Sequence, residues 1–529
     1  MIPSRLAQGG ALTLSVGLLH LVLVMPAHPA GLTLAQVLRP TWELPMVLLA
    51  LAILPGRWMR GMVVALSLVL VVLRGANVAT FMALSRPFNP LLDIHLLVSG
   101  WDLLRSSIGT GLAIGALALL LLALAALTGL LWACLSCWPA IPVPTRATVA
   151  ALALALPLLT LTVPHWRAFV MTPVVTDQIS RMSRDMADLS AFTETLSQAP
   201  DPQPGFAALE DRDVIVAFVE SYGRSFLDDP EFAKIARPRL RAVEDRLQAA
   251  GWYVRSAFAA APTRGGQSWL SHGTLLSGLQ VDSQTRYERL MRSDRASLNR
   301  LFGKAGWRTG AAMPAITLDW PEAAWFGYDT TLDADALAYR GQPFEWVTMP
   351  DQYTWSAMDR MLRQPGPDMI ELALISSHAP WTPLPRIVPW EDIGDGAIFD
   401  GSHRDGATPA EVWADRESIR TQYARSLDYA LEVTGQYIAR NGEGALFVVL
   451  GDHQPAPLIT GHDAPPDVPV HIISNDPHLL DRLPADIFGE GIFPPDGPVI
   501  RMQDLRKILV TAFETPLEPP LPSHDRRTQ

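Results

Sequence analysis

Side chains capable of acid, base or metal chemistry follow three apolar runs in the second half of the chain. Glu220 ends the run "VIVAFVE", His378 follows "IELALISS", and the pair Asp452 and His453 follows "ALFVVLG". Charged groups are rarely placed at the end of an all-apolar strand without a partner. Any one of them could be a solvated loop residue, but three such strand ends together predict a convergent metal or phosphate site.

A candidate nucleophile lies in the stretch "GGQSWLSHGTLLSG", which begins at Gly265. Gly265 and Gly266 let the backbone turn tightly, and Ser268 would begin the helix that follows. The free N–H groups and the dipole at a helix N-terminus favour a bound anion. Two alternatives stay open here, because Ser268 could be a simple N-cap and His272 could belong to an amphipathic face.

The elements that must position these residues are strands that alternate with helices. The stretches "DVIVAFVES", "WYVRSAFAA", "WRTGAAMP", "MIELALISSH", "ALFVVLGDH" and "VPVHIISND" predict strands, and residues 410–440 predict the longest helix. This alternation predicts an α/β domain with a largely parallel sheet. Such sheets bind ligands at the carboxyl ends of their strands, which is where the polar residues fall.

The ordered set of motifs resembles the alkaline phosphatase and sulfatase superfamily, and within it the membrane-bound lipoteichoic acid synthase and phosphoethanolamine transferase branch. The glycine that closes the sulfatase nucleophile signature falls on Gly278. The resemblance implies an alkaline phosphatase-like fold with Ser268 as the nucleophile. It also implies that Glu220, Asp452 and His453 bind a divalent metal ion together with the Ser268 oxygen.

The resemblance implies further roles around this centre. The element "SSHAPW" is similar to a histidine motif of the branch, so His378 would contact the phosphate or assist proton transfer. His272 takes the position of the sulfatase arginine and would contact a phosphate oxygen. Trp381 would line the pocket, with core packing as an equal alternative, and His462 would add a metal or substrate contact unless it is a loop histidine. Oxygen ligands with one imidazole suit Mn²⁺ or Zn²⁺, with Mg²⁺ as a further candidate.

The nucleophile segment departs from the sulfatase signature at two positions. It has Leu270 and His272 where that signature has proline and arginine, so we expect Ser268 to remain an unmodified serine. The region "AITLDWPEAAWFGYD" holds Trp320 but lacks the Trp-x-Arg element that lipoteichoic acid synthases use for phosphoglycerol. The domain also lacks the cysteines of disulfide-rich phosphoethanolamine transferases. The sequence therefore leaves the transferred head group open.

The first 165 residues hold nearly all the long apolar runs of the chain. Runs able to cross about 30 Å of hydrocarbon predict a helical membrane bundle of five spans. The spans lie near Gly10–Ala27, Trp42–Leu54, Gly61–Ala79, Gly109–Trp138 and Thr148–Val163. The first run also resembles a cleaved signal peptide. Cys134 and Cys137 stand in the fourth run, which favours thiols near a helix end over a redox or metal pair.

The rest of the chain divides into a helical linker over residues 166–206, a catalytic domain over 207–515 that the resemblance covers, and a disordered tail over 516–529. Arginines are spread evenly over the predicted inside and outside loops, so they do not set the orientation. Five spans from an inside N-terminus, or a cleaved signal and four spans, both place the catalytic domain outside the cytoplasm. We therefore expect an integral protein of the plasma (inner) membrane with a periplasmic or other extracytoplasmic catalytic domain.

The predicted function is that of a metal-dependent transferase anchored in the bilayer. The resemblance implies that a phosphoglycerol or phosphoethanolamine head group moves from a membrane phospholipid to an envelope glycan or lipid through a phosphoserine. A net charge of −11 argues against a nucleic-acid binder, which needs a basic face. The alternatives are a membrane-anchored sulfatase-like phosphodiesterase or sulfuric ester hydrolase, and a non-catalytic lipid-binding domain. The presence of both Glu220 and Asp452 favours an enzyme.

Overall fold

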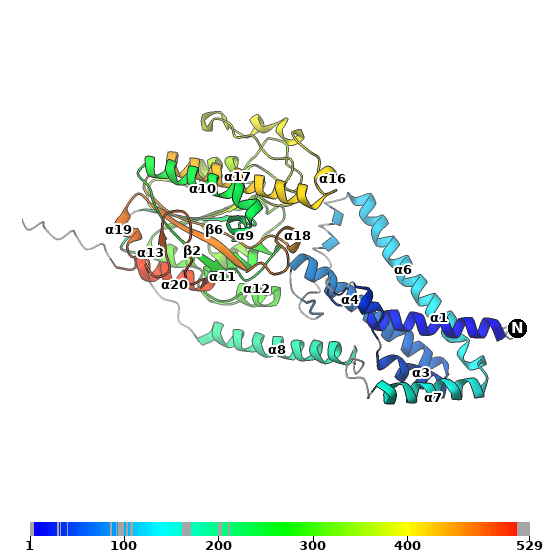
Figure 1. The fold of residues 1–529 in the computed structure, drawn as a ribbon. Helices are drawn as coiled ribbons and strands as arrows, with labels where there is room; N and C mark the ends of the chain where they lie inside the picture. Colours follow the sequence, from blue (N-terminus) through cyan, green and yellow to red (C-terminus); the bar gives the residue numbers. More distant parts are fainter. Residues whose placement is uncertain are drawn as a thin grey trace, which may run out of the picture. The chain divides into compact units, whose positions relative to one another are not determined.

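The computed structural model describes residues 5–28, 31, 33–39, 41–84, 87–90, 93, 100–101, 104–105, 109–160, 171–198, 204–209 and 212–515. The chain divides into two compact units, Met1–Ser190 and Ala191–Gln529. Figure 1 colours both units along the sequence. The predicted disordered tail lies outside the described residues, and the predicted domain boundary near residue 207 stays a prediction.

The described part of the first unit is helical. Its elements are α1 (Arg5–Val24), α2 (Leu34–Val37), α3 (Glu43–Ile53), α4 (Arg57–Leu84), α6 (Thr110–Ser136), η2 (Trp138–Ala140), α7 (Val143–Thr160) and α8 (Met171–Gln198), the last of which runs into the second unit. The α8 helix lies within the predicted helical linker. Two segments are long and apolar enough to cross a membrane, namely Arg57–Ala83 and Thr110–Ala140. Shorter apolar helices over Gly9–Val24, Glu43–Ile53 and Val143–Ala155 overlap the other predicted spans, so the count of five stays a prediction.

A small core holds the helices of the first unit together. Leu51, Leu131 and Trp138 are fully buried in it, and the indole Nε1 of Trp138 donates a hydrogen bond to Ser15 Oγ at 3.2 Å. The α6 helix in contrast exposes a series of leucine side chains, of which Leu112 and Leu119 are each 69% exposed. An exposed apolar face of this kind suits contact with lipid. The thiols Cys134 and Cys137 are free.

The second unit is built on one mixed sheet of nine strands in the order β4-β3-β5-β1-β6-β7-β2-β8, with β9 paired to β2. The strands are β1 (Asp213–Val219), β2 (Tyr253–Ala260), β3 (Arg308–Ala312), β4 (Thr330–Leu332), β5 (Asp368–Leu374), β6 (Ala445–Gly451), β7 (Asp467–Ser474), β8 (Gly489–Glu490) and β9 (Ile500–Arg501). The run from β4 to β6 is parallel throughout. The strand β7 runs antiparallel to both β6 and β2, so the predicted parallel order holds for the part of the sheet that carries the candidate site.

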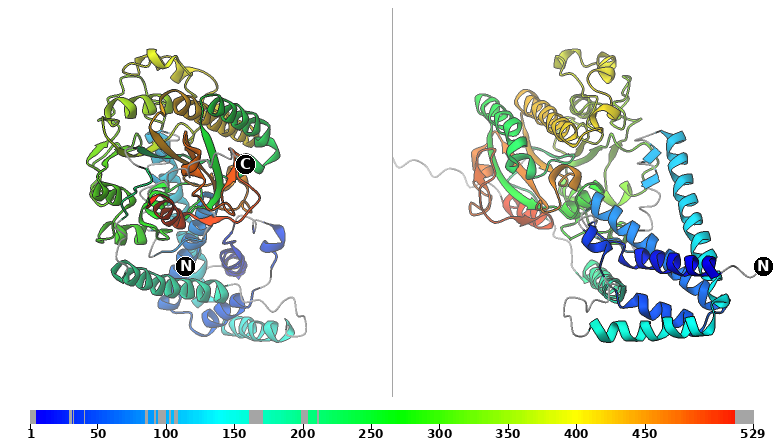
Figure 2. Two further views of the ribbon diagram at one scale, coloured as in Figure 1. Left: turned by 90° about the vertical axis from the view of Figure 1, so that its left-hand side faces the viewer. Right: turned by 45° about the vertical axis from the view of Figure 1, so that its right-hand side comes forward.

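Helices cover both faces of this sheet. They are α9 (Ser225–Asp228), α10 (Pro230–Ala249), α11 (Ser268–Ser277), α12 (Gln284–Met291), α13 (Leu298–Ala305), α14 (Ala323–Phe326), α15 (Asp351–Met361), α16 (Pro409–Val412), α17 (Arg416–Asn441), α18 (Pro457–Thr460), α19 (Pro477–Leu480) and α20 (Met502–Phe513). Short 3₁₀ helices η4 (Trp390–Asp392), η5 (Ala397–Phe399) and η6 (Ser402–Arg404) lie between α15 and α16. Figures 1 and 2 show α10 and α17 on one side of the sheet and α11 and α20 on the other.

The central strand β1 shows why the sheet needs two helical layers. Its side chains alternate between two hydrophobic cores, with Ile215 and Ala217 in the core beneath α10 and α17. Val216 and Phe218 belong to the core that contains α11, α13 and α20. Because successive side chains of a strand point to opposite faces, an all-apolar strand must be covered on both sides. This places the polar residues at the strand ends and not along the strand.

The six predicted strands are confirmed, since each overlaps one of the strands β1, β2, β3, β5, β6 and β7 to within one residue at its start. The single helix predicted over residues 410–440 is wrong in one respect, because it divides into α16 and α17. Asp415 separates the two, and its carboxylate accepts a hydrogen bond from the Ser418 N–H at 2.8 Å. An aspartate in extended conformation at this position begins a new helix in place of continuing the previous one.

Candidate active site

Two adjacent strand ends bring the predicted carboxylates together. Val219, the last residue of β1, pairs with Gly451, the last residue of β6, so Glu220 and Asp452 leave the sheet at the same level. A side-chain carbon on Gly451 would lie 1.9 Å from the carbonyl oxygen of Tyr222. Glycine at this position therefore permits the close approach of the two chain segments that carry the acidic groups.

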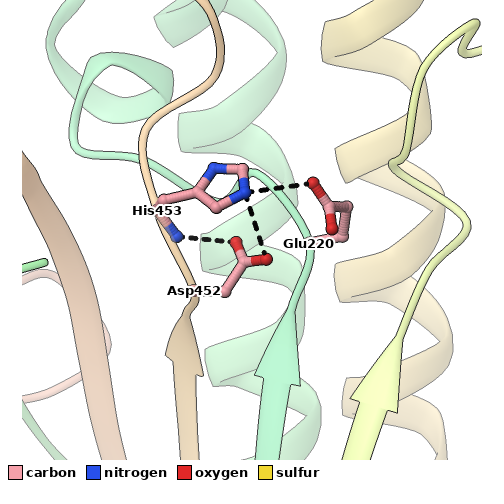
Figure 3. Close-up of side chains that lie close together, drawn as sticks. All are labelled: Glu220, Asp452 and His453. Atoms are coloured by element: carbon pink, nitrogen blue, oxygen red, sulfur yellow. Dashed lines mark hydrogen bonds and ion pairs between the residues drawn. The ribbon is translucent and has the colours of Figure 1, made fainter. Parts of the chain in front are cut away.

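Glu220, Asp452 and His453 form a compact, buried cluster (Figure 3). One potential ligand atom from each residue lies within 4.8 Å of the others. The Nε2 atom of His453 is 3.5 Å from Glu220 Oε1 and 3.5 Å from Asp452 Oδ2. All three side chains are buried, with exposed fractions of 8%, 2% and 1%. The structure thus brings these three predicted residues together, and their role as metal ligands stays a prediction.

Hydrogen bonds fix the orientation of each member of the cluster. Asp452 Oδ1 accepts from the backbone N–H groups of Ser221 at 2.7 Å and His453 at 2.6 Å, and the Ser221 hydroxyl donates to Glu220 Oε1 at 2.7 Å. The Nδ1 atom of His453 lies 2.9 Å from the Gln454 carbonyl oxygen. Because a carbonyl oxygen only accepts, Nδ1 carries the proton, and Nε2 is the atom that faces the two carboxylates.

The pKa shifts of the three side chains show that the cluster attracts positive charge. Burial and the neighbouring Glu220 raise the pKa of Asp452 to about 7. Burial by itself would lower the pKa of His453, but Asp452 and Glu220 raise it above its ordinary value. Burial by itself would raise the pKa of Glu220, yet His453 and His378 hold it below its ordinary value. Two buried carboxylates and an oriented imidazole nitrogen are a donor set that fits a divalent cation.

Ser268 reaches this cluster from the start of α11. It is the first residue of α11, after a turn in which Gly265 and Gln267 have positive φ angles of 72° and 65°. Its Oγ lies 3.2 Å from Glu220 Oε2 and 3.2 Å from His453 Nε2. The N-cap position belongs to Gln267, which makes no side-chain cap bond. The alternative of Ser268 as a simple N-cap is therefore wrong, and its hydroxyl faces the candidate metal ligands.

His378 lies near the cluster, whereas two other predicted residues make different contacts. His378 Nδ1 lies 2.6 Å from its acceptor, the Ala379 carbonyl oxygen. Trp381 is 6% exposed, donates from Nε1 to the Ser377 carbonyl oxygen at 2.9 Å and stacks on Trp413, which agrees with the packing alternative. Among the described residues, the metal-ligating cluster does not include His462. The substrate or metal roles of Trp381 and His462 stay predictions.

His272 extends from α11 into the core beneath the sheet. Its Nδ1 lies 2.5 Å from Glu371 Oε1, and its ring stacks on Phe218 with a centroid distance of 3.8 Å. Glu371 is fully buried on β5 and also accepts a hydrogen bond from the Tyr328 hydroxyl at 2.5 Å. These contacts tie the nucleophile helix to the sheet. A phosphate contact by His272 stays a prediction, and its observed partners are structural.

Several residues that support the site were not singled out by sequence analysis. The Tyr423 hydroxyl donates to the Ser221 carbonyl oxygen at 2.9 Å. The hydroxyl of Ser377 donates to the Glu220 carbonyl oxygen at 2.6 Å, and that of Ser271 donates to the Asp452 carbonyl oxygen at 2.6 Å. All three hold the backbone of the segments that carry the candidate metal ligands. A hydrogen bond from a hydroxyl to a backbone carbonyl oxygen requires no particular spacing in the sequence. Only the closeness of some of these residues to the predicted site residues could have indicated their role.

Asp351, at the start of α15, holds the loop that leads from β5 to His378, and its replacement tests the pH dependence of stability. Its Oδ1 accepts from the backbone N–H groups of Ile375 at 2.7 Å and Ser376 at 2.9 Å, while Oδ2 is buried without a partner among the described groups. Burial raises the pKa of Asp351 to about 7. This raised pKa contributes stability that is fully present below the ordinary aspartate pKa and is lost as pH rises through 7.

We expect Asp351→Asn to remove that loss, because asparagine keeps the Oδ1 acceptor and cannot ionise. The unfolding temperature of the variant, measured by scanning fluorimetry of the full chain in detergent, should rise relative to that of the natural protein between pH 5 and pH 8. The difference corresponds to a few kcal/mol at most, on the order of 1.4 kcal/mol per pKa unit. A difference that does not change with pH would show that Asp351 does not titrate in this range.

Comparisons with known proteins place the chain beside a set of solved structures. No protein-family model and no curated protein matches its sequence. The lipoteichoic acid synthase LtaP from Listeria monocytogenes aligns at 12% identity with a TM-score of 0.38, over 61% of this chain and 78% of that one. The C-terminal periplasmic domain of EptC from Escherichia coli aligns at 13% identity with a TM-score of 0.38, over 58% of this chain and 82% of that one.

A third aligned structure is the Streptococcus pyogenes phosphoglycerol transferase GacH in complex with sn-glycerol-1-phosphate. It has 11% identity and a TM-score of 0.38, over 62% of this chain and 80% of that one. The matched structures thus include a lipoteichoic acid synthase, the kind of enzyme that the sequence motifs resemble.

Proposed function

We propose that this protein is a metal-dependent transferase that moves a phospho-head group, of the phosphoglycerol or phosphoethanolamine type, from a membrane phospholipid to an envelope glycan or lipid. The observation that carries the proposal is the position of the Ser268 hydroxyl. It lies 3.2 Å from both Glu220 Oε2 and His453 Nε2, at the N-terminus of a helix and beside a buried acidic cluster. A serine placed in this way is a candidate nucleophile for phosphoryl transfer.

Glu220, Asp452, His453 and the Ser268 oxygen would hold one divalent cation, Mn²⁺ or Zn²⁺, with Mg²⁺ as a further candidate. When bound, such a cation lowers the pKa of a hydroxyl and polarises phosphoryl oxygens. The backbone bonds to Asp452 and the Ser221 bond to Glu220 hold the carboxylates in place. These outer contacts therefore set the orientation of the ligands before substrate binds.

Ser268 and His378 carry the proposed reaction. After its proton passes to solvent, Ser268 Oγ bonds to phosphorus while the bond from phosphorus to the diacylglycerol oxygen breaks. His378 gives a proton to that oxygen from Nε2, because Nδ1 is held by the Ala379 carbonyl oxygen. An acceptor hydroxyl then attacks the phosphorus of the phosphoserine, and its proton passes to His378. The bond from phosphorus to Ser268 Oγ breaks, and Ser268 takes back a proton from solvent. The N–H groups at the start of α11 favour the anionic phosphate in both steps.

The apolar helices of the first unit support a membrane location for the substrate. The segments Arg57–Ala83 and Thr110–Ala140 are able to cross a bilayer. Anchoring of this kind would keep the catalytic unit at the lipid surface and raise the effective concentration of the phospholipid donor. We place the catalytic unit on the extracytoplasmic side of the plasma (inner) membrane, where an envelope acceptor would be available.

The decisive experiment incubates the full-length protein in detergent with Mn²⁺ or Zn²⁺ and a mixed phospholipid extract. Peptide mass spectrometry should find a head-group phosphate on the peptide that carries Ser268, and Ser268→Ala should lack it. Products formed with and without an acceptor glycan separate transfer from hydrolysis. Released head group without a stable adduct would favour a hydrolase, and a formylglycine at position 268 would indicate a sulfatase.

A further inference from the structure

An exposed tryptophan lies directly on the histidine to which proton transfer is assigned. The rings of Trp346 and His378 stack with a centroid distance of 4.5 Å and an interplanar angle of 12°. Trp346 is 42% exposed, so the stack lies at the surface of the catalytic unit and not in its core. A large apolar side chain at the surface has a solvation cost that this contact with His378 only partly offsets.

The backbone around Trp346 is built as a tight turn with anchored ends. Phe344 and Val347 exchange two backbone hydrogen bonds, at 2.7 Å and 3.0 Å, and both side chains are buried, with 2% and 5% exposed. Of the two residues between them, Glu345 precedes Trp346 and has a φ of 56°. A positive φ in a residue other than glycine costs free energy, and such backbone strain is often found at functional sites. The turn holds Trp346 outward, against the imidazole.

Two contacts together determine the orientation of the His378 ring. The bond from Nδ1 to the Ala379 carbonyl oxygen, at 2.6 Å, fixes the direction in the plane of the ring. The indole face of Trp346 fixes the tilt of that plane. Within the part of the chain that the structure describes, His378 Nε2 makes no hydrogen bond. The atom that remains available to substrate is therefore held in one direction.

We propose that Trp346 is a positioning residue, which orients His378 for proton transfer to and from the substrate oxygens. The inference rests on the proposed function, because it assigns a purpose to a residue that acts through His378. It goes beyond that function by adding a second loop, far from His378 in sequence, to the machinery of the site. A misoriented proton donor slows the chemical step with little effect on substrate binding.

The test compares Trp346→Leu, Trp346→Phe and Trp413→Leu in the full chain with Mn²⁺ and phospholipid. Leucine keeps apolar volume without an aromatic face, and phenylalanine keeps the face. Trp413 is the matched control, since it is 45% exposed and stacks on Trp381 and not on His378. We expect Trp346→Leu to lower kcat about tenfold at unchanged KM. Trp346→Phe should keep most of the natural kcat, and Trp413→Leu should keep all of it.

A second readout needs no turnover. Diethyl pyrocarbonate acylates accessible imidazole nitrogens, and peptide mass spectrometry gives the rate at His378. The rate should change several-fold in Trp346→Leu and stay constant in Trp346→Phe and Trp413→Leu. An unchanged acylation rate at His378 in Trp346→Leu would overturn the inference. A changed acylation rate in a variant that keeps the full kcat would overturn it as well. If the natural protein forms no adduct on Ser268 and no product, the proposed function fails, and the positioning role falls with it even where the acylation rate changes.

Discussion

Replacing Ser268 with alanine should reduce head-group transfer by at least about a thousandfold, because the group that bonds to phosphorus is lost. The fold should survive, since the hydrogen bonds of the Ser268 side chain are to Glu220 and His453 and not to the core. Threonine is the matched variant, because it keeps a hydroxyl at the start of α11. Initial rates with a fluorescent phospholipid, measured with and without an acceptor glycan, give both values.

Two results would contradict this expectation. If Ser268→Ala retained more than about a tenth of the rate, a nucleophile other than Ser268 would be required. If Ser268→Ala and Ser268→Thr were both unfolded, the expectation that the fold survives the loss of this side chain would be wrong. The unfolding temperature of each variant, with and without Mn²⁺, therefore accompanies the rates.

Changing Asp452 to asparagine should abolish both activity and stabilisation by a divalent cation. Asp452 Oδ1 accepts two backbone N–H bonds and Oδ2 faces His453, so the amide removes one negative charge from the cluster and introduces a hydrogen-bond donor into it. In the natural protein a saturating cation should raise the free energy of unfolding by about 2.7 kcal/mol at a hundredfold excess over Kd. The variant should show almost none of this effect.

The control for Asp452→Asn is Asp481→Asn, which removes an exposed carboxylate that pairs with Arg255 on β2. Thermal unfolding of the full chain is followed across a titration with Mn²⁺ and, separately, Zn²⁺, after removal of bound metal by a chelator. Equal cation-dependent shifts in the natural protein and in Asp452→Asn would show that the cluster is not the metal site. A loss of the shift in Asp481→Asn would point to a metal site elsewhere.

The pattern of polar residues at strand ends located most of the candidate site. Glu220, Asp452 and His453 could be predicted because a strand buried on both faces has room for charge only where it leaves the sheet. The glycines before Ser268 marked the turn into α11. The resemblance to a known superfamily then assigned roles that no single motif could carry.

The position of His272 could not be predicted from sequence spacing. Its spacing from Ser268 places both on one face of α11, which agrees with a shared site. The helix runs from the sheet edge down beneath the strands, so one turn moves the side chain from the cluster to the buried Glu371 on β5. How far each side chain of a packed helix lies from the sheet edge depends on how the helix packs against the sheet. The spacing of residues along the helix contains no information about that packing.

The sequence by itself determined the elements and the chemistry that they carry: the alternating strands and helices, the apolar N-terminal helices, and the acidic and imidazole groups at the strand ends. Secondary-structure propensity and hydrophobic periodicity depend on residues that are close together in the sequence, so these elements can be predicted from a single sequence. Only the tertiary structure decided that Ser268 lies 3.2 Å from Glu220 and His453, that β7 runs antiparallel to β6, and that Trp346 stacks on His378. These features join segments far apart in the chain, and such contacts are fixed by the order and docking of elements, which no local pattern contains.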